Sequence, residues 1–139
     1  AITHTARTRL QPDGHGLKNV GIPQYLDADS SGTSNVCVSA TVGAERLRKF
    51  TEWLRLNHRR GFLGEFGTGN NTVCNEALKG MLRYMETNAD VWLGWTCWTA
   101  GSWWNVSYEY SVQPNKDGTD RPQMSILSPN AVYATRFSP

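Results

Sequence analysis

The stretch RRGFLGEFGTGNN, residues 59–71, places one carboxylate, Glu65, at the end of a short apolar run and follows it with glycines and asparagines. A short apolar run bounded by Gly is typical of a buried β-strand. The sequence therefore predicts a strand over 62–66 that ends at a carboxylate, followed by a loop over 67–75.

Helical periodicity flanks this strand on both sides. The segment 41–59 carries apolar residues mostly on one face at helical spacing, with Arg and Lys opposite. Its apolar members are Leu47, Phe50, Trp53, Leu54 and Leu56. A second amphipathic helix is predicted over 76–87. Its apolar members are Leu78, Met81, Leu82 and Met85.

The segment VWLGWTCW, residues 91–98, is apolar on both faces, which is typical of a strand in a buried parallel sheet. An earlier apolar run at 17–26 contains Pro23, so we expect it to be a strand end or an edge. A closing helix is predicted over 129–137. The alternation of strands and helices predicts an α/β fold with a parallel sheet and right-handed crossovers.

Functional side chains stand where the predicted strands end. Tyr25, Glu65 and Trp98 each lie at the end of a predicted strand, and in such sheets these ends meet on one rim. An indole packs on the apolar face of a sugar, and an oxocarbenium-like anomeric carbon needs a carboxylate beside it. Taken singly, such a Glu is more often a solvated surface residue. Their joint position favours a sugar site.

Composition excludes several classes of protein. The 139 residues carry 14 basic and 12 acidic side chains, for a net charge of +2, which gives no electrostatic case for binding nucleic acid or an anionic membrane. No run of 18 apolar residues is present, so no membrane span is expected. The three histidines have no metal-ligand spacing, and we predict neither a metal nor a cofactor.

Tryptophan is unusually frequent, with six residues, four of them close together. These four are Trp95, Trp98, Trp103 and Trp104. A cluster in a Gly-containing stretch indicates a partly exposed aromatic surface, because the indole N–H needs a partner. Filling of the core is the alternative, since large apolar rings are most often buried.

The three cysteines allow three pairings. Cys97 lies in an apolar run and is predicted to be a buried thiol, whereas Cys37 and Cys74 have polar surroundings. A bridge between Cys37 and Cys74 is therefore favoured. It would contribute about 3–4 kcal/mol in the chain-entropy model and would imply an oxidising compartment.

Residues 24–124 resemble the C-terminal part of glycoside hydrolase family 5 cellulases, the secreted fungal-type endo-β-1,4-glucanases. The matching pieces are QYLDADSSGTSNVCVS, GFLGEFGTGNN, ALKGMLRYMETNADVWLGWTCWTAGSWW and SVQPNKDGTDRPQM. The resemblance implies a partial (β/α)8 TIM barrel with about three β/α units, corresponding to strands six to eight. Residues 1–16 are then an unmatched N-terminal tail, and residues 17–139 are the C-terminal part of the hydrolase domain.

The resemblance also assigns roles to individual residues. It implies a retaining mechanism with Glu65 as the nucleophile, hydrogen-bonded by Tyr25. The substrate-stacking indole of the family falls on Trp98, and the disulfide of the family falls on Cys37 and Cys74. Trp103 and Trp104, from the same tryptophan cluster, are further candidates for binding substrate. The implied substrate is β-1,4-glucan, as cellulose or cello-oligosaccharides, and the implied location is extracellular.

Two departures from the family pattern bear on activity. The His of its His-x-Tyr motif is Pro23 here, and the Asn-Glu-Pro motif that holds the acid/base is absent. The sequence Asn75-Glu76 reads more simply as the acidic start of a helix. Three hypotheses therefore remain. The chain is an active cellulase-type hydrolase, a non-catalytic β-glucan-binding fragment, or an inert half-barrel.

Three strands of a barrel leave two open edges and an uncovered inner face. We therefore expect the chain to form a homo-dimer or a higher homo-oligomer. A carboxylate from a second copy would then be able to serve as the acid. The candidates near the rim are Asp27, Asp29 and Glu109.

Overall fold

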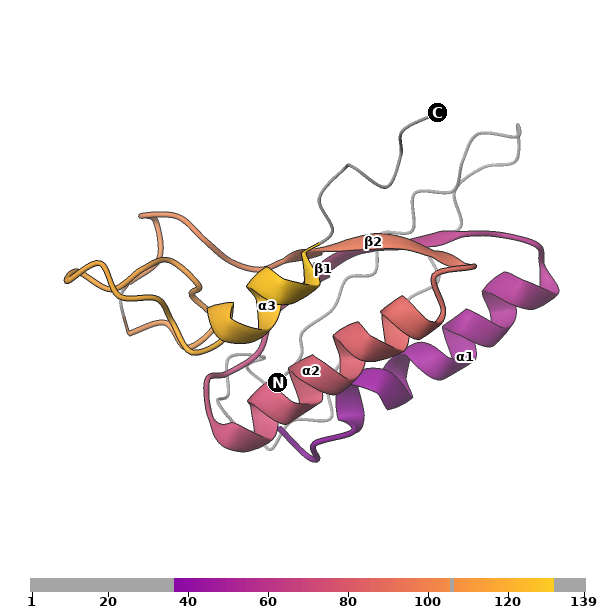
Figure 1. Ribbon diagram of the computed structural model, residues 1–139, viewed down its shortest axis with the longest axis horizontal. Helices are drawn as coiled ribbons and strands as arrows, with labels where there is room; N and C mark the ends of the chain where they lie inside the picture. The colour runs from indigo at the N-terminus through magenta and orange to yellow at the C-terminus, as the bar shows by residue number, and fades with distance from the viewer. Residues whose placement is uncertain (1–36, 106, 132–139) are drawn as a thin grey trace.

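The computed structural model describes residues 37–105 and 107–131. The elements within them are α1 (Val42–Leu56), β1 (Gly61–Phe66), α2 (Thr72–Thr87), β2 (Trp92–Cys97) and α3 (Met124–Asn130). Figure 1 shows α1 and α2 lying alongside each other on one side of the β1–β2 ribbon, and α3 packs against α2. No helix in the described part of the chain is long and apolar enough to cross a membrane.

The two strands are parallel neighbours, as predicted. Gly61 lies opposite Trp92 and Phe66 lies opposite Cys97, with irregular register between these pairs. Helix α2 makes the connection that a parallel pair requires. The predicted strand around 17–26 lies outside the described residues.

The core fills the space between this sheet and the two long helices. The buried apolar side chains that α1, α2 and β1 contribute to the core cluster are Val42, Leu47, Phe50, Leu54, Leu63, Phe66, Ala77, Leu78, Met81, Leu82 and Met85. The predicted amphipathic faces of both helices are therefore largely confirmed. Two members of the first face are not buried, because Trp53 is 36% exposed and Leu56 is 80% exposed. Leu56 follows the buried Leu54 by two positions, which turns it toward the opposite side of a helix.

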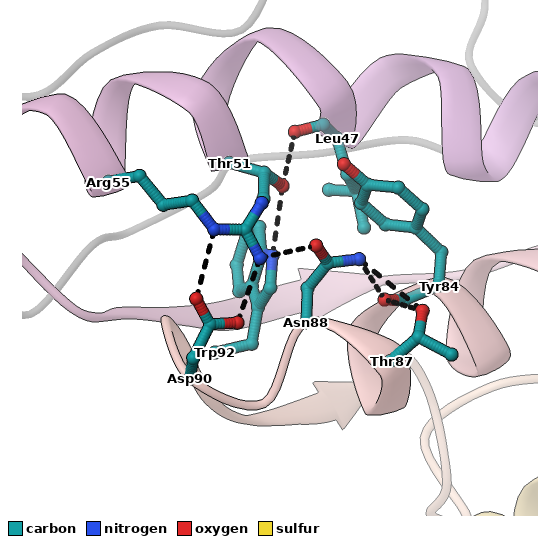
Figure 2. A network of polar contacts seen from close by, with 8 residues as sticks. All are labelled: Leu47, Thr51, Arg55, Tyr84, Thr87, Asn88, Asp90 and Trp92. Carbon is teal, nitrogen blue, oxygen red and sulfur yellow. Dashed lines mark hydrogen bonds and ion pairs between the residues drawn. The ribbon is translucent and has the colours of Figure 1, made fainter.

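Thr51, which the apolar pattern passed over, occupies part of the buried face of α1. Its hydroxyl donates to the carbonyl of Leu47 at 2.8 Å and accepts from Nε1 of Trp92 at 3.0 Å (Figure 2). The buried indole N–H of the first residue of β2 therefore has a partner on α1, as a buried tryptophan requires.

Two predicted helix boundaries are wrong. Helix α2 begins at Thr72 because the side chain of Asn71 accepts a hydrogen bond from the Cys74 amide at 2.9 Å and caps the helix. The predicted loop over 67–75 thus ends at Asn71, and Glu76 lies in the second turn rather than at the helix start. Helix α3 begins at Met124 instead of the predicted Pro129, and it ends at Asn130, after which Ala131 is extended. The rest of the predicted closing helix lies outside the described residues.

The prediction that β2 is buried on both faces is also corrected. Trp92 is buried, but Leu93 is 41% exposed and Thr96 is exposed. Helices α1 and α2 lie on one side of the β1–β2 ribbon (Figure 1). The apolar pattern of β2 is therefore only partly used in this structure.

A polar network joins the end of α1 to the turn between α2 and β2 (Figure 2). Nε and Nη2 of Arg55 donate to the two carboxylate oxygens of Asp90 at 2.9 and 2.8 Å. Nη2 also donates to Oδ1 of Asn88 at 2.7 Å. The network lies at the amino end of β2, at the opposite end of the sheet from Glu65.

Candidate active site

The candidate site lies at the carboxyl ends of β1 and β2. Phe66 and Cys97 are opposite each other, Glu65 precedes Phe66 on β1, and Trp98 comes directly after the end of β2. The amide of Trp98 donates to the carbonyl of Phe66 at 2.6 Å and extends the pairing past the end of the sheet. The structure therefore brings Glu65 and Trp98 to neighbouring strand ends. Tyr25 lies outside the described residues.

The close contacts at Gly67 explain why one of the residues that frame the Glu65 carboxylate is a glycine. A Cβ at this position would lie 2.6 Å from the carbonyl oxygen of Trp98 and 3.2 Å from the ring of Tyr110. Only glycine leaves room for the backbone at this position to lie so close to the Trp98 carbonyl. The peptide bond between Trp98 and Thr99 is cis. Glu65 itself is half-buried.

Aromatic side chains continue the site beyond β2. Trp98 is half-buried, and its Nε1 donates to the hydroxyl of Tyr108 at 3.3 Å. The ring of Trp104 packs edge-on against Trp98 at a centroid distance of 5.3 Å and stacks on Tyr108 at 4.7 Å. Trp103 is 90% exposed and stands apart from these rings. Of the three predicted substrate-binding indoles, Trp98 and Trp104 are therefore brought together and Trp103 is not.

The sequence left open whether the tryptophan cluster forms an exposed aromatic surface or fills the core, and its members do both. Trp95 packs edge-on against the buried Phe66 at 5.5 Å, at the margin of the core. Trp103 belongs instead to the exposed surface. Tyr108 is a member of the site that was not predicted. Tyr108 and Tyr110 alternate with other residues in SYEY, and this spacing was the feature of the sequence that could have indicated that their side chains share one face.

Gln123 holds the loop after Glu65 in place. Its side chain is buried, and its Nε2 donates to the carbonyls of Thr68 at 3.3 Å and Glu109 at 2.9 Å. These bonds join the segment that follows β1 to the segment that carries Tyr108. Nothing in the sequence distinguishes Gln123 from a surface glutamine.

The disulfide prediction is confirmed. Cys37 and Cys74 are bonded, with Cα atoms 5.2 Å apart and a sequence separation of 37. The bridge ties the segment before α1 to the first turn of α2. Cys97 is a free thiol that is only partly buried, and desolvation raises its pKa to about 12. It is therefore protonated at neutral pH and is a poor nucleophile.

The model of a known family, cellulase (glycosyl hydrolase family 5), matches residues 20–101. The chain belongs to this family, as the sequence resemblance predicted. Endo-β-1,4-glucanase B of Aspergillus niger is 52% identical over 96 residues, which are 69% of this chain and 28% of that protein. The chain thus spans less than a third of the length of this curated relative.

Solved structures agree with this assignment. An endo-β-1,4-glucanase of Xanthomonas axonopodis pv. citri is 70% identical with a TM-score of 0.72, and the match covers 77% of this chain and 34% of that one. XacCel5A in complex with cellopentaose is 63% identical with a TM-score of 0.72, over 78% of this chain and 34% of that one. These neighbours imply a (β/α)8 barrel, of which the described residues form a partial α/β piece.

Proposed function

We propose that this chain is the part of an endo-β-1,4-glucanase that carries the catalytic nucleophile, Glu65, and acts by a retaining mechanism. The observation that carries the proposal is the position of Glu65 at the carboxyl end of a parallel strand, next to the strand end that Trp98 follows. In barrel hydrolases this end of the sheet is where catalysis occurs. Endoglucanases with this segment, at 70% identity in one solved case, support β-1,4-glucan as the substrate.

The chemistry assigned to Glu65 is attack on the anomeric carbon. Its carboxylate forms a bond to that carbon as the bond to the leaving sugar oxygen breaks, and water later hydrolyses the glycosyl-enzyme ester. Trp98 and Trp104 supply apolar faces for the sugar rings, and the exposed Trp103 supplies a further platform along a polymer. Tyr25 is proposed to donate a hydrogen bond to Glu65.

A retaining mechanism needs a second carboxyl group about 5–5.5 Å from the first to protonate the leaving oxygen. The sequence has no Asn-Glu-Pro motif to provide it. We propose that the acid comes from outside this segment, and that a second copy is one source when the chain stands alone. On that second copy, Asp27, Asp29 and the half-buried Glu109 are the candidates.

The test is hydrolysis of soluble carboxymethyl-cellulose by the purified chain, with Glu65→Gln prepared alongside. Release of reducing ends is expected from the wild type and is expected to fall by roughly 10⁴-fold or more in the variant, because the nucleophile is lost. Glu76→Gln is the matched control, since Glu76 is exposed on α2. Equal rates for wild type and Glu65→Gln would contradict the assignment.

A second candidate function is β-glucan binding without hydrolysis. The 90% exposure of Trp103, together with the missing acid/base motif, favours this alternative. It predicts that cello-oligosaccharide changes the tryptophan fluorescence while no reducing ends appear. If neither signal appears, the chain is inert, as the third hypothesis holds.

Secretion is the location proposed for the protein. The disulfide between Cys37 and Cys74 supports it, because structural disulfides persist in oxidising environments. A polymeric substrate such as cellulose also has to be met outside the cell.

A further inference from the structure

Tyr108 lies among the aromatic side chains that follow β2. Its hydroxyl accepts a hydrogen bond from Nε1 of Trp98 at 3.3 Å. Its ring stacks on Trp104, with ring centroids 4.7 Å apart and planes inclined by 22°. The ring of Tyr110 lies 5.4 Å away. One phenol therefore contacts both of the clustered tryptophans to which a role in binding sugar is assigned.

The main chain on either side of Trp98 is fixed independently of Tyr108. The amide of Trp98 donates to Phe66, the amide of Thr99 donates to the carbonyl of Tyr110 at 3.2 Å, and the amide of Val112 donates to the carbonyl of Thr99 at 2.9 Å. These bonds hold the backbone but leave the two side-chain torsions of Trp98 unset. Because Trp98 is only half-buried, packing restrains part of its ring and leaves the rest to specific contacts.

We propose that Tyr108 is a positioning residue that sets the orientation of the Trp98 indole for sugar stacking. The inference rests on the proposed function, in which Trp98 stacks on glucan beside Glu65. An indole binds a sugar well only when its face is parallel to the apolar face of the ring. The hydroxyl of Tyr108 holds the edge of the indole, and Trp104 holds Tyr108 in turn. Tyr108 touches no reacting atom in this arrangement.

The deciding variant is Tyr108→Phe, which removes the acceptor oxygen and keeps the ring that stacks on Trp104. The ¹⁵N–¹H spectrum of the labelled chain contains an indole resonance for Trp98, which Trp98→Phe assigns by its disappearance. In Tyr108→Phe this resonance is expected to move upfield as the hydrogen bond is lost. The dissociation constant for cellopentaose is expected to rise roughly two- to tenfold, the effect of one neutral hydrogen bond.

Tyr84→Phe is the matched control, since Tyr84 is a half-buried tyrosine of α2 outside the aromatic cluster. It is expected to change neither the Trp98 resonance nor the affinity. Tyr108→Leu provides a second variant that also removes the stacking on Trp104, and it is expected to weaken cellopentaose binding further. The dispersion of the amide spectrum establishes that each variant is folded.

The outcomes separate this inference from the function on which it rests. If wild type and Tyr108→Phe bind cellopentaose equally well and share the Trp98 resonance, the positioning role is wrong and the glucan site stands. If the wild type does not bind cellopentaose, the proposed glucan site fails and the positioning role fails with it. A shifted resonance together with weaker binding supports the inference.

Discussion

At the scale of single residues, the candidate site depends on a close approach between two segments of the backbone, which Gly67 permits. Replacing Gly67 by Ala would place a Cβ 2.6 Å from the carbonyl oxygen of Trp98, which is backbone and unable to rotate away. We expect Gly67→Ala to lower the free energy of unfolding by about 1–3 kcal/mol, as overpacking usually does. Urea denaturation followed by far-UV circular dichroism measures this change.

Gly80 provides the matched control because it lies within α2, where a Cβ would meet the carbonyl oxygen of Ala40 at an ordinary 3.7 Å. Gly80→Ala is expected to be neutral or to stabilise the chain by about 0.5–1 kcal/mol, since alanine favours a helix interior. If both variants had the same unfolding midpoint, the steric role of Gly67 would be refuted.

At the scale of elements, the network around Arg55 joins α1 to the turn before β2. The hydrogen bonds from Arg55 hold the pKa of Asp90 below its ordinary value. A depressed carboxyl pKa stabilises the fold above the ordinary pKa of Asp, and this contribution is lost as the pH falls through the pKa of the folded state. We expect Arg55→Met to lower the melting temperature at pH 7, with the difference from wild type shrinking below about pH 4.

Both side chains of this pair are exposed, so the effect is expected to be small and to decrease with added salt. Arg48→Met, at an exposed position of the same helix outside the network, is the control and removes the same charge. Melting curves of the three proteins between pH 3 and pH 7 at two salt concentrations make the comparison. A constant difference for Arg55→Met at every pH would show that the carboxylate is not responsible.

The same scale shows what the sequence was able to predict. Helical periodicity located α1 because it reports the face that a helix turns to the core, and short apolar runs located β1 and β2. The start of α2 was missed because its cap, Asn71, lies in a polar stretch that also reads as a loop. Helix α3 was misplaced since Pro129, a residue common at helix starts, lies in its last turn.

The site was predictable where it follows from strand order and not where it depends on loops. Glu65 and Trp98 are neighbours because parallel strands end at the same edge of a sheet. The contact of Trp98 with Tyr108 depends on the path of the intervening chain, which backbone bonds to Thr99 and the side chain of Gln123 determine. No short-range pattern in the sequence encodes those tertiary bonds.

At the scale of the whole molecule, helices α1 and α2 lie together on one side of the β1–β2 sheet in the part of the chain that the structure describes (Figure 1). Among the described residues, β1 and β2 pair only with each other, and Leu93 of β2 is 41% exposed. Strand edges and apolar sheet faces of this kind are templates for association. We therefore propose that the 139-residue chain, studied alone, associates through this sheet into a homo-dimer or a higher homo-oligomer.

Sedimentation over a range of concentrations tests this proposal, with an expected species heavier than the 15.5 kDa of one chain. Leu93→Glu is expected to shift the population toward the monomer, because a charge on the exposed strand opposes both pairing and burial. Leu56→Glu is the control, since Leu56 is 80% exposed on α1. A clean monomer for the wild type at every concentration would rule out association, and a second copy could then not supply the acid that Glu65 needs.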